Sequence, residues 1–160
     1  MRLSQHFRLS EFTRTGTGLP NQPTDEHRLS LRALCVDVLE PLRAYVGAPV
    51  RVTSGYRSQT VNEAVGGSAT SQHCCGDAAD IKVSGWSAEE LAGAVIDSVN
   101  NSRLHQVIAY HPTRGGHVHV GRGNGRCQVL YRAANGAYQA PPPEQVADWV
   151  DAARRRRAGA

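Results

Sequence analysis

The chain has 160 residues, of which 40% are hydrophobic and 20% are charged. This balance is typical of a soluble globular protein and excludes a disordered or fibrous chain. No stretch approaches the roughly 18 consecutive apolar residues that a membrane-spanning helix needs, and residues 1–6 do not lead into an apolar signal region. We therefore expect a single domain that is synthesised in the cytoplasm without an export signal.

The formal net charge is +4, and the four arginines at positions 154–157 account for the whole excess. The rest of the chain is about neutral, and aromatic residues make up only 6% of it. A nucleic-acid-binding surface needs basic residues and stacking aromatics on the body of the domain. We therefore expect no nucleic-acid partner, and we expect the arginine run to be a solvated, frayed end of the chain.

Four cysteines occur, at positions 35, 74, 75 and 127, with no C-x-x-C spacing. They form neither a recognisable disulfide framework nor a zinc finger. Adjacent Cys74 and Cys75 could bind a metal or form a vicinal disulfide. The favoured interpretation is that the cysteines are small hydrophobic residues in an ordinary core.

Helical periodicity is strongest after Thr24. The apolar positions of this first helix are three and four residues apart: Leu31, Leu34, Val38, Leu42 and Tyr45. Pro41 predicts a kink or restart near Glu40, and residues 47–49 end the helix. Ser87 and Glu90 form a capping box at the head of a second helix.

Five runs rich in β-branched residues predict strands at 50–53, 79–83, 106–110, 117–120 and 128–131. The last three are expected to be consecutive antiparallel strands. Helices before and between strands favour an α+β fold, with a small antiparallel sheet and flanking helices. We predict a domain over residues 1–140, followed at 141–160 by a Pro-rich linker, a short helix and a basic tail.

Histidines and an aspartate occur at spacings that suit a metal site. His73 precedes a glycine turn, and Asp80 begins a predicted strand. His117 and His119 share one face of another strand, because side chains alternate along it. Imidazole and carboxylate bind zinc well, and three protein ligands plus water make a catalytic site. A closed structural site formed by all four residues is the alternative. The small residues at 76–79 leave room for a cleft beside the sheet.

Arg57 follows the first predicted strand. An arginine on such a loop can donate to a carboxylate or to the oxyanion of a tetrahedral intermediate. The alternative is an ordinary solvated surface arginine.

Several motifs in fixed order resemble one known family. They are Ser54-Gly55-Tyr56-Arg57-Ser58, Asn62, Val65-Gly66-Gly67-Ser68, Ser71-x-His73-x-x-Gly76-x-Ala78-x-Asp80 and His117-x-His119. Together they resemble the zinc D-alanyl-D-alanine carboxypeptidases, a family that includes phage L-alanyl-D-glutamate endolysins and vancomycin-resistance dipeptidases. The resemblance runs from about Ser4 to Val120, because residues 4–12 are similar to the opening segment of the short cell-wall peptidase branch.

The resemblance implies an α+β fold and one zinc ion, held by the residues that match the family's ligands: His73, Asp80 and His119. Arg57 matches the arginine that stabilises the developing charge. Ser71 and Tyr56 are expected beside the bound substrate.

The catalytic base is less directly implied. Many relatives carry Glu or Asp three residues before the last ligand, where this chain has Gly116. In the H-x-H branch the first histidine occupies the catalytic neighbourhood, which makes His117 the expected proton shuttle. Asp77 is an alternative acid or base.

The resulting hypothesis is a monomeric zinc peptidase that cuts the stem peptides of bacterial peptidoglycan. It would act as a carboxypeptidase or an endopeptidase, at the cell wall after phage-type release. Loops 16–24 and 110–116 are expected to border the cleft and influence which bond is cut. The alternative, which Gly116 keeps open, is a non-catalytic module that binds wall peptides or holds a structural metal.

Overall fold

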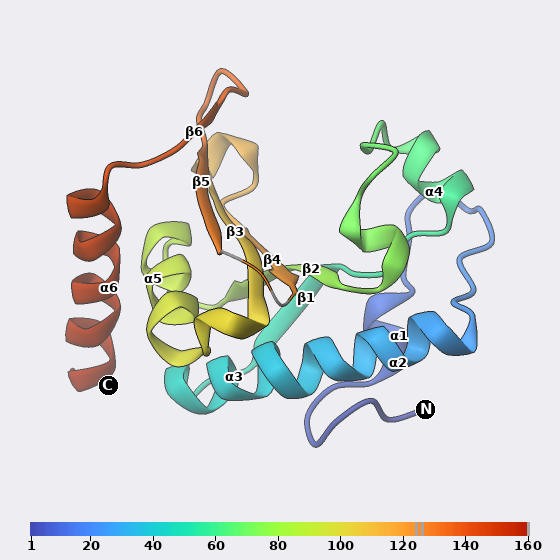
Figure 1. Ribbon diagram of the computed structural model, residues 1–160, viewed down its shortest axis with the longest axis horizontal. Helices are drawn as coiled ribbons and strands as arrows, with labels where there is room; N and C mark the ends of the chain where they lie inside the picture. Colours follow the sequence, from blue (N-terminus) through green and yellow to red (C-terminus); the bar gives the residue numbers. More distant parts are fainter. Residues whose placement is uncertain (124, 126, 160) are drawn as a thin grey trace.

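The protein folds around one six-stranded sheet of order β1-β2-β4-β3-β5-β6, flanked by helices (Figure 1). The computed structural model describes residues 1–123, 125 and 127–159. The strands are β1 (Val50–Ser54), β2 (Ala78–Val83), β3 (Leu104–Tyr110), β4 (Val118–Arg122), β5 (Gln128–Arg132) and β6 (Tyr138–Gln139). The α-helices are α1 (Leu9–Phe12), α2 (Asp25–Leu34), α3 (Glu40–Val46), α4 (Gln59–Ala64), α5 (Ala88–Ser98) and α6 (Pro143–Ala158). This arrangement confirms the predicted α+β class.

One strand pair differs from the predicted antiparallel order. β3 pairs with β4 in the antiparallel sense, but β5 runs parallel to β3 and pairs with its other edge. The reason is that β4 lies between β2 and β3, so both of its edges are already hydrogen-bonded. The chain that leaves β4 therefore does not pair with β4 itself. It joins the sheet at the free edge of β3, and reversing direction after β4 makes it parallel to β3.

The first long helix is irregular where the sequence predicted it. After α2 the chain forms a π-helical segment over Cys35–Leu39, and α3 follows directly. The backbone N–H of Glu40 donates to the carbonyl of Cys35, five residues earlier. Pro41 has no N–H, and its ring would clash with the carbonyl four residues before it in a regular α-helix. The wider turn accommodates this proline without ending the helix.

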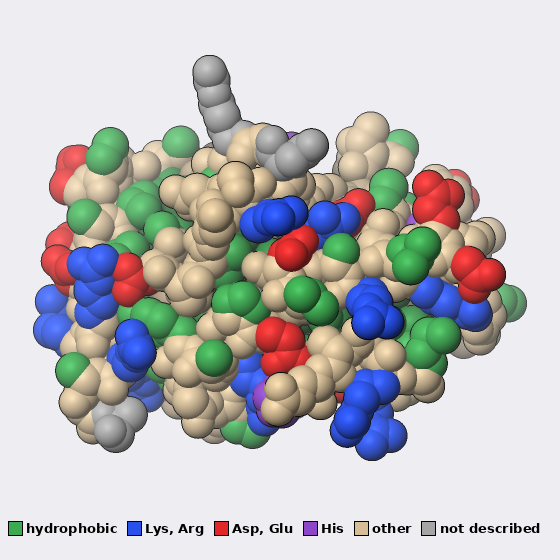
Figure 2. All heavy atoms as spheres, turned by 60° about the horizontal axis from the view of Figure 1, so that its bottom comes forward, with side chains coloured by type: hydrophobic (Ala, Val, Ile, Leu, Met, Phe, Trp, Pro, Cys, Tyr) green, Lys and Arg blue, Asp and Glu red, His purple; other side chains and the backbone are tan. Residues whose placement is uncertain are grey.

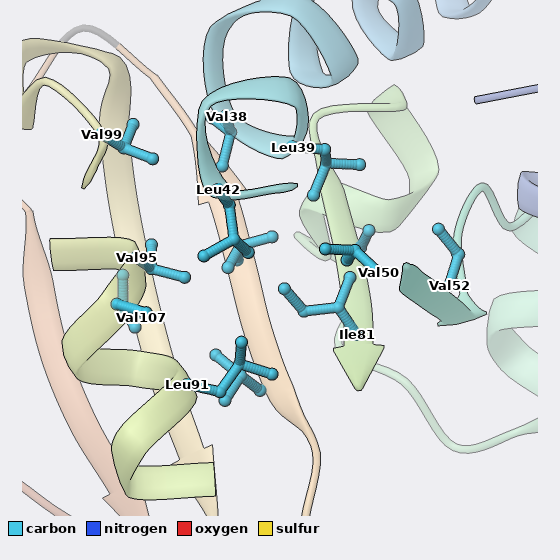
Figure 3. Close-up of a cluster of buried hydrophobic side chains, with 14 of the residues drawn as sticks. Val38, Leu39, Leu42, Val50, Val52, Ile81, Leu91, Val95, Val99 and Val107 are labelled. Atoms are coloured by element: carbon cyan, nitrogen blue, oxygen red, sulfur yellow. The ribbon is translucent and has the colours of Figure 1, made fainter. Parts of the chain in front are cut away.

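One face of the sheet packs on helices and forms the core. Figure 3 shows Leu91 and Val95 of α5 and Leu42 of α3 directed towards Ile81 of β2 and Val107 of β3. All five side chains are almost completely buried. Because side chains alternate along a strand, the neighbours of these core residues lie on the opposite face of the sheet. That second face carries the candidate functional residues.

The C-terminal helix α6 packs against α5 (Figure 1). Trp149 is buried in the common core. Arg154 forms an ion pair with Asp97 at 2.6 Å, and Arg156 lies beside Glu90 at 3.3 Å. The expectation of a frayed chain end is wrong, because residues 154–157 belong to α6 and acidic side chains of α5 pair with two of the arginines, but all four arginines are exposed to solvent as expected. The division at residue 140 stays a prediction.

The charged side chains do not gather into a basic surface on the face that Figure 2 shows, where both signs are interspersed. No helix in the described part of the chain is long and apolar enough to cross a membrane. All four cysteines are free thiols. Cys35 is buried as expected and Cys127 packs, partly buried, against the core, whereas Cys74 is partly buried and Cys75 is exposed, so the small-hydrophobe interpretation holds for Cys35 and Cys127.

Replacement of Gly93 tests the close packing of α5 on α6. A Cβ atom at this position would collide with the backbone carbonyl of Trp149. We expect Gly93→Ala to lower the free energy of unfolding by about 1–3 kcal/mol, although the same change in an open helix raises it by about 1 kcal/mol. Urea denaturation measures the effect. Gly16→Ala, where a Cβ atom meets nothing within 4 Å, is the control. A Gly93→Ala protein as stable as the wild type would contradict this packing.

Candidate metal centre

His73 is held in one orientation by the backbone. It lies in a short 3₁₀ helix, η2 (Gln72–Cys75), and is 4% exposed. Its Nδ1 atom lies 2.6 Å from the carbonyl oxygen of Gly55. A carbonyl oxygen can only accept, so Nδ1 carries the proton and donates it. The Nε2 atom is left with its lone pair, 3.5 Å from Oδ1 of Asp80.

The register of the sheet places Asp80 and His119 side by side. Asp80 of β2 pairs directly with His119 of β4. Nδ1 of His119 lies 3.1 Å from Oδ1 of Asp80, and the rings of His73 and His119 are 5.2 Å apart. The three side chains offer ligand atoms that all lie within 4.8 Å of one another, so they could hold a metal ion.

The charges of this group suit a cation. Burial opposes ionisation of Asp80, but the hydrogen bond from His119 and the electrostatic interaction with His73 outweigh it and hold the pKa of this carboxyl well below its usual range. Burial lowers the pKa of His119. The centre therefore combines an ionised carboxylate with a neutral imidazole, the protonation states that metal ligands require. Two imidazoles and one carboxylate form a donor set that fits zinc.

Arg57 lies against the same group. Its Nη2 atom is 3.4 Å from Oδ2 of Asp80, and both Nε and Nη2 interact with Oγ of Ser54, at 3.3 and 3.1 Å. Its backbone N–H donates to the carbonyl of His73. The side chain is only 19% exposed. Arg57 is thus not a solvated surface residue, because two contacts orient its guanidinium and a third ties its backbone to the ligand loop.

Asn21 holds the loop that carries Arg57, and the sequence analysis did not identify it. Its side-chain amide donates to the carbonyl of Tyr56 at 2.8 Å, and its Oδ1 accepts from the backbone N–H of Ser58 at 2.7 Å. These two bonds are on either side of Arg57. No local pattern marks Asn21, which belongs to a Pro-flanked loop whose partner is more than thirty residues away.

The three candidate ligands, His73, Asp80 and His119, lie in a cleft of about 670 Å³ over the exposed face of the sheet. The cleft lies between residues 66–73 on one side and β3 and β5 on the other. Ser71 lines it, as the resemblance implies. Loop 16–24 does not, and of loop 110–116 only Tyr110 does. The other lining residues on the sheet side are His105, Gln106, Ile108, Gln128, Leu130 and Tyr138.

The sequence analysis did not identify these sheet residues as part of the site. The strand that carries Tyr138 was not predicted. The sequence of β3 and β5 did not indicate which of their faces is open, because Ile108 in the cleft is as apolar as its neighbours Val107 and Ala109 in the core.

His117 lies outside the metal group, and it is not among the described residues that line the cleft. Among the described residues the group of candidate ligands contains His73, Asp80 and His119. The four-ligand structural site is therefore not formed. His117 precedes β4, and its ring stacks on Tyr110 with centroids 4.1 Å apart. Burial lowers the pKa of His117.

Two expected site residues lie elsewhere. Asp77, the alternative acid or base, does not line the cleft. Its carboxylate forms an ion pair with Arg122 at 2.8 Å instead. The side chain of Tyr56 is buried in the core, with its ring 4.9 Å from that of His27. It cannot reach a substrate in the main cleft, because its aromatic ring packs inward.

The turn before His117 explains why no acidic residue occupies position 116. Gly115 and Gly116 both have positive φ angles, of 100° and 56°. Side chains other than glycine rarely adopt this conformation. Among the described residues that line the cleft, Asp80 is the only one with a carboxylate.

A comparison with known protein families gives one match. The family model described as Peptidase M15 matches residues 5–121. No curated protein sequence matches the chain. The matched stretch contains the three candidate ligands and Arg57, and it ends before β5 begins.

The pKa shift of His119 predicts how the metal-free protein responds to acid. The folded-state pKa lies below the unfolded value near 6.5, so the unfolded chain binds more protons below that pH. We expect the free energy of unfolding to fall as the pH drops from 7 to 5, and to fall less steeply in His119→Gln. Denaturant titrations at several pH values measure both slopes. Exposed His105→Gln should keep the wild-type slope. An unchanged slope in His119→Gln would show that this residue does not carry the effect.

Proposed function

Because the chain belongs to the peptidase M15 family, we propose that it is a zinc metallopeptidase that hydrolyses the stem peptides of bacterial peptidoglycan. Members of the family are metal-dependent hydrolases of peptides, so the reaction class follows from membership. The observation that supports the proposal is the group of His73, Asp80 and His119 at the end of an open cleft. The bacterial cell wall is then the place of action, because these peptides occur there.

Three residues would hold the metal. The hydrogen bond from Nδ1 of His73 to Gly55 orients the ring so that Nε2 faces Oδ1 of Asp80. The sheet register places Nδ1 of His119 beside the same oxygen. When bound, a zinc ion supplies a Lewis acid that polarises a carbonyl and lowers the pKa of water. Three protein ligands leave a coordination position for substrate chemistry, as in catalytic rather than structural sites.

Arg57 would stabilise the charge that develops on the substrate. As the scissile carbonyl is attacked, its oxygen becomes negative, and a fixed donor at that point lowers the barrier. Ser54 orients the guanidinium, so little reorganisation is needed when the charge appears. The guanidinium also lines the cleft beside Asp80.

His117 is our candidate for proton transfer. Burial lowers its pKa, so the imidazole is neutral at pH 7 and can accept a proton from the attacking water. The same nitrogen would then pass that proton to the leaving amine. Stacking on Tyr110 fixes the ring, and its position outside the ligand group leaves it available for this cycle.

One observation favours a second candidate function. The described residues that line the cleft include no carboxylate besides Asp80, whereas many relatives carry an acidic residue where this chain has Gly116. Without a competent base the domain would bind wall peptides and a metal but not cut them. This non-catalytic alternative retains the same metal group and the same cleft.

Digestion of purified peptidoglycan separates the two functions. We expect the zinc-loaded protein to release peptide fragments, identified by mass spectrometry, and a chelator to stop the release. Arg57→Ala should lower kcat about 10²–10³-fold, the typical effect of removing one oxyanion donor. His117→Ala should lower kcat while retaining zinc.

Arg51→Ala, an exposed arginine outside the cleft, is the matched control and should cut at the wild-type rate. No cleavage by a wild-type protein that holds one equivalent of zinc would favour the binding module. Wild-type activity in Arg57→Ala would remove this residue from the mechanism.

A further inference from the structure

Part of the cleft is built by residues beyond the stretch that matches the family. The match ends at residue 121, but Gln128 and Leu130 of β5 and Tyr138 of β6 line the cleft. The cleft therefore continues from the metal group across β3 to strands that the family match does not cover. We call its far part the distal arm, formed by Gln106, Ile108, Tyr110, Gln128, Leu130 and Tyr138.

The sheet register gives the distance from the metal group to this arm. Asp80 pairs with His119, and His119 with Ile108. Ile108 in turn pairs with Leu130, so these residues form one row across four neighbouring strands. Neighbouring strands lie about 4.8 Å apart, which places the backbone of Leu130 about 10 Å from that of His119. An extended peptide covers this distance in about three residues.

The centre of the distal arm is apolar. Ile108 is 5% exposed, and Leu130 beside it is partly buried. On one side of this row, the side-chain amide of Gln106 donates to that of Gln128 at 2.7 Å. On the other side, the hydroxyl groups of Tyr110 and Tyr138 lie 3.5 Å apart. The arm is thus an aliphatic floor between two rims that can hydrogen-bond a peptide backbone.

The charge of the arm restricts what it can bind. None of its six residues is acidic or basic in character, and burial together with the Tyr138 hydroxyl raises the pKa of Tyr110 still further above its usual range. A cationic side chain would find no carboxylate to compensate for its lost hydration. A short aliphatic side chain, such as the methyl group of alanine, fits the floor without this cost.

We propose that β5 and β6 supply a substrate subsite, the distal arm, which binds an uncharged aliphatic residue of the peptide about three residues from the scissile bond. The inference rests on the proposed peptidase function and deepens it. Its consequence is that the enzyme prefers peptides that extend at least three residues from the cut bond over a dipeptide.

The first test compares synthetic peptides that share one scissile bond and extend from one to four residues on either side. We expect kcat/KM to rise by about tenfold or more when one of the two extensions reaches the third residue. Replacing that residue by lysine should remove most of the gain. Equal kcat/KM for all lengths would overturn the proposal.

Two variants locate the effect. Leu130→Asp, and Tyr138→Ala at a 53% exposed position, should raise KM for the longest peptide and leave kcat/KM for the shortest one unchanged. Leu29→Asp, at a 70% exposed leucine of α2, is the matched control. If circular dichroism shows that Leu130→Asp does not fold, Tyr138→Ala carries the test. An equal loss for long and short peptides, or no loss in Tyr138→Ala, would contradict the assignment.

A binding measurement separates this inference from the proposed function. Calorimetry with the metal-free protein and the longest peptide gives a Kd without hydrolysis. If Tyr138→Ala weakens this binding although the zinc-loaded wild type cuts nothing, the subsite stands and the peptidase function fails. If the wild type cuts the peptide and Tyr138→Ala changes neither Kd nor KM, the function stands and the subsite fails.

Discussion

The antiparallel register of β2 and β4 sets Asp80 opposite His119, and the candidate metal centre depends on this pairing. A slip of one residue by either strand would turn its own side chain of this pair to the other face of the sheet. The core prevents such a slip, because Ile81 and Val120, next to them in sequence, are fully buried on the helix side. Each buried apolar neighbour therefore helps to hold a polar side chain in the cleft. The packing that stabilises the fold is the same packing that aligns the site.

The site also contains a buried charge, the carboxylate of Asp80, whose removal from water is unfavourable. A carboxylate that is 8% exposed is stable only if nearby groups compensate for its lost hydration. Arg57 and His119 direct donors at Asp80, whereas the hydrogen bond from His73 to Gly55 leaves the unprotonated Nε2 of His73 facing it. A divalent cation would replace part of this compensation with a full charge. The arrangement is thus a preorganised site for a cation, and the cleft makes it accessible.

Residue type and local spacing predicted a group of four candidate ligands, and the family resemblance selected three of them. His73 and Asp80 are separated by one glycine turn, and His119 lies on a strand with a clear alternation. The positions of Asp77 and Tyr56 were not predictable in this way, since their partners Arg122 and His27 are distant in sequence. The same holds for β5, whose place beside β3 depends on β4 already lying between β2 and β3. Local pattern thus indicated which residues bind, whereas tertiary contacts decided which of their neighbours face the cleft.

The measurement that tests the central claim most directly is the zinc content and affinity of four variants, by elemental analysis and competition with a chelating dye. His73→Ala, Asp80→Asn and His119→Ala each remove one proposed ligand, and His105→Ala removes a histidine that lines the cleft outside the group. The account predicts one equivalent of zinc in the wild type and in His105→Ala. Each ligand variant should bind zinc more than about 100-fold more weakly than the wild type. This loss exceeds the usual effect of replacing a residue that only hydrogen-bonds to a ligand. Wild-type affinity in any of these three variants would contradict the assigned centre.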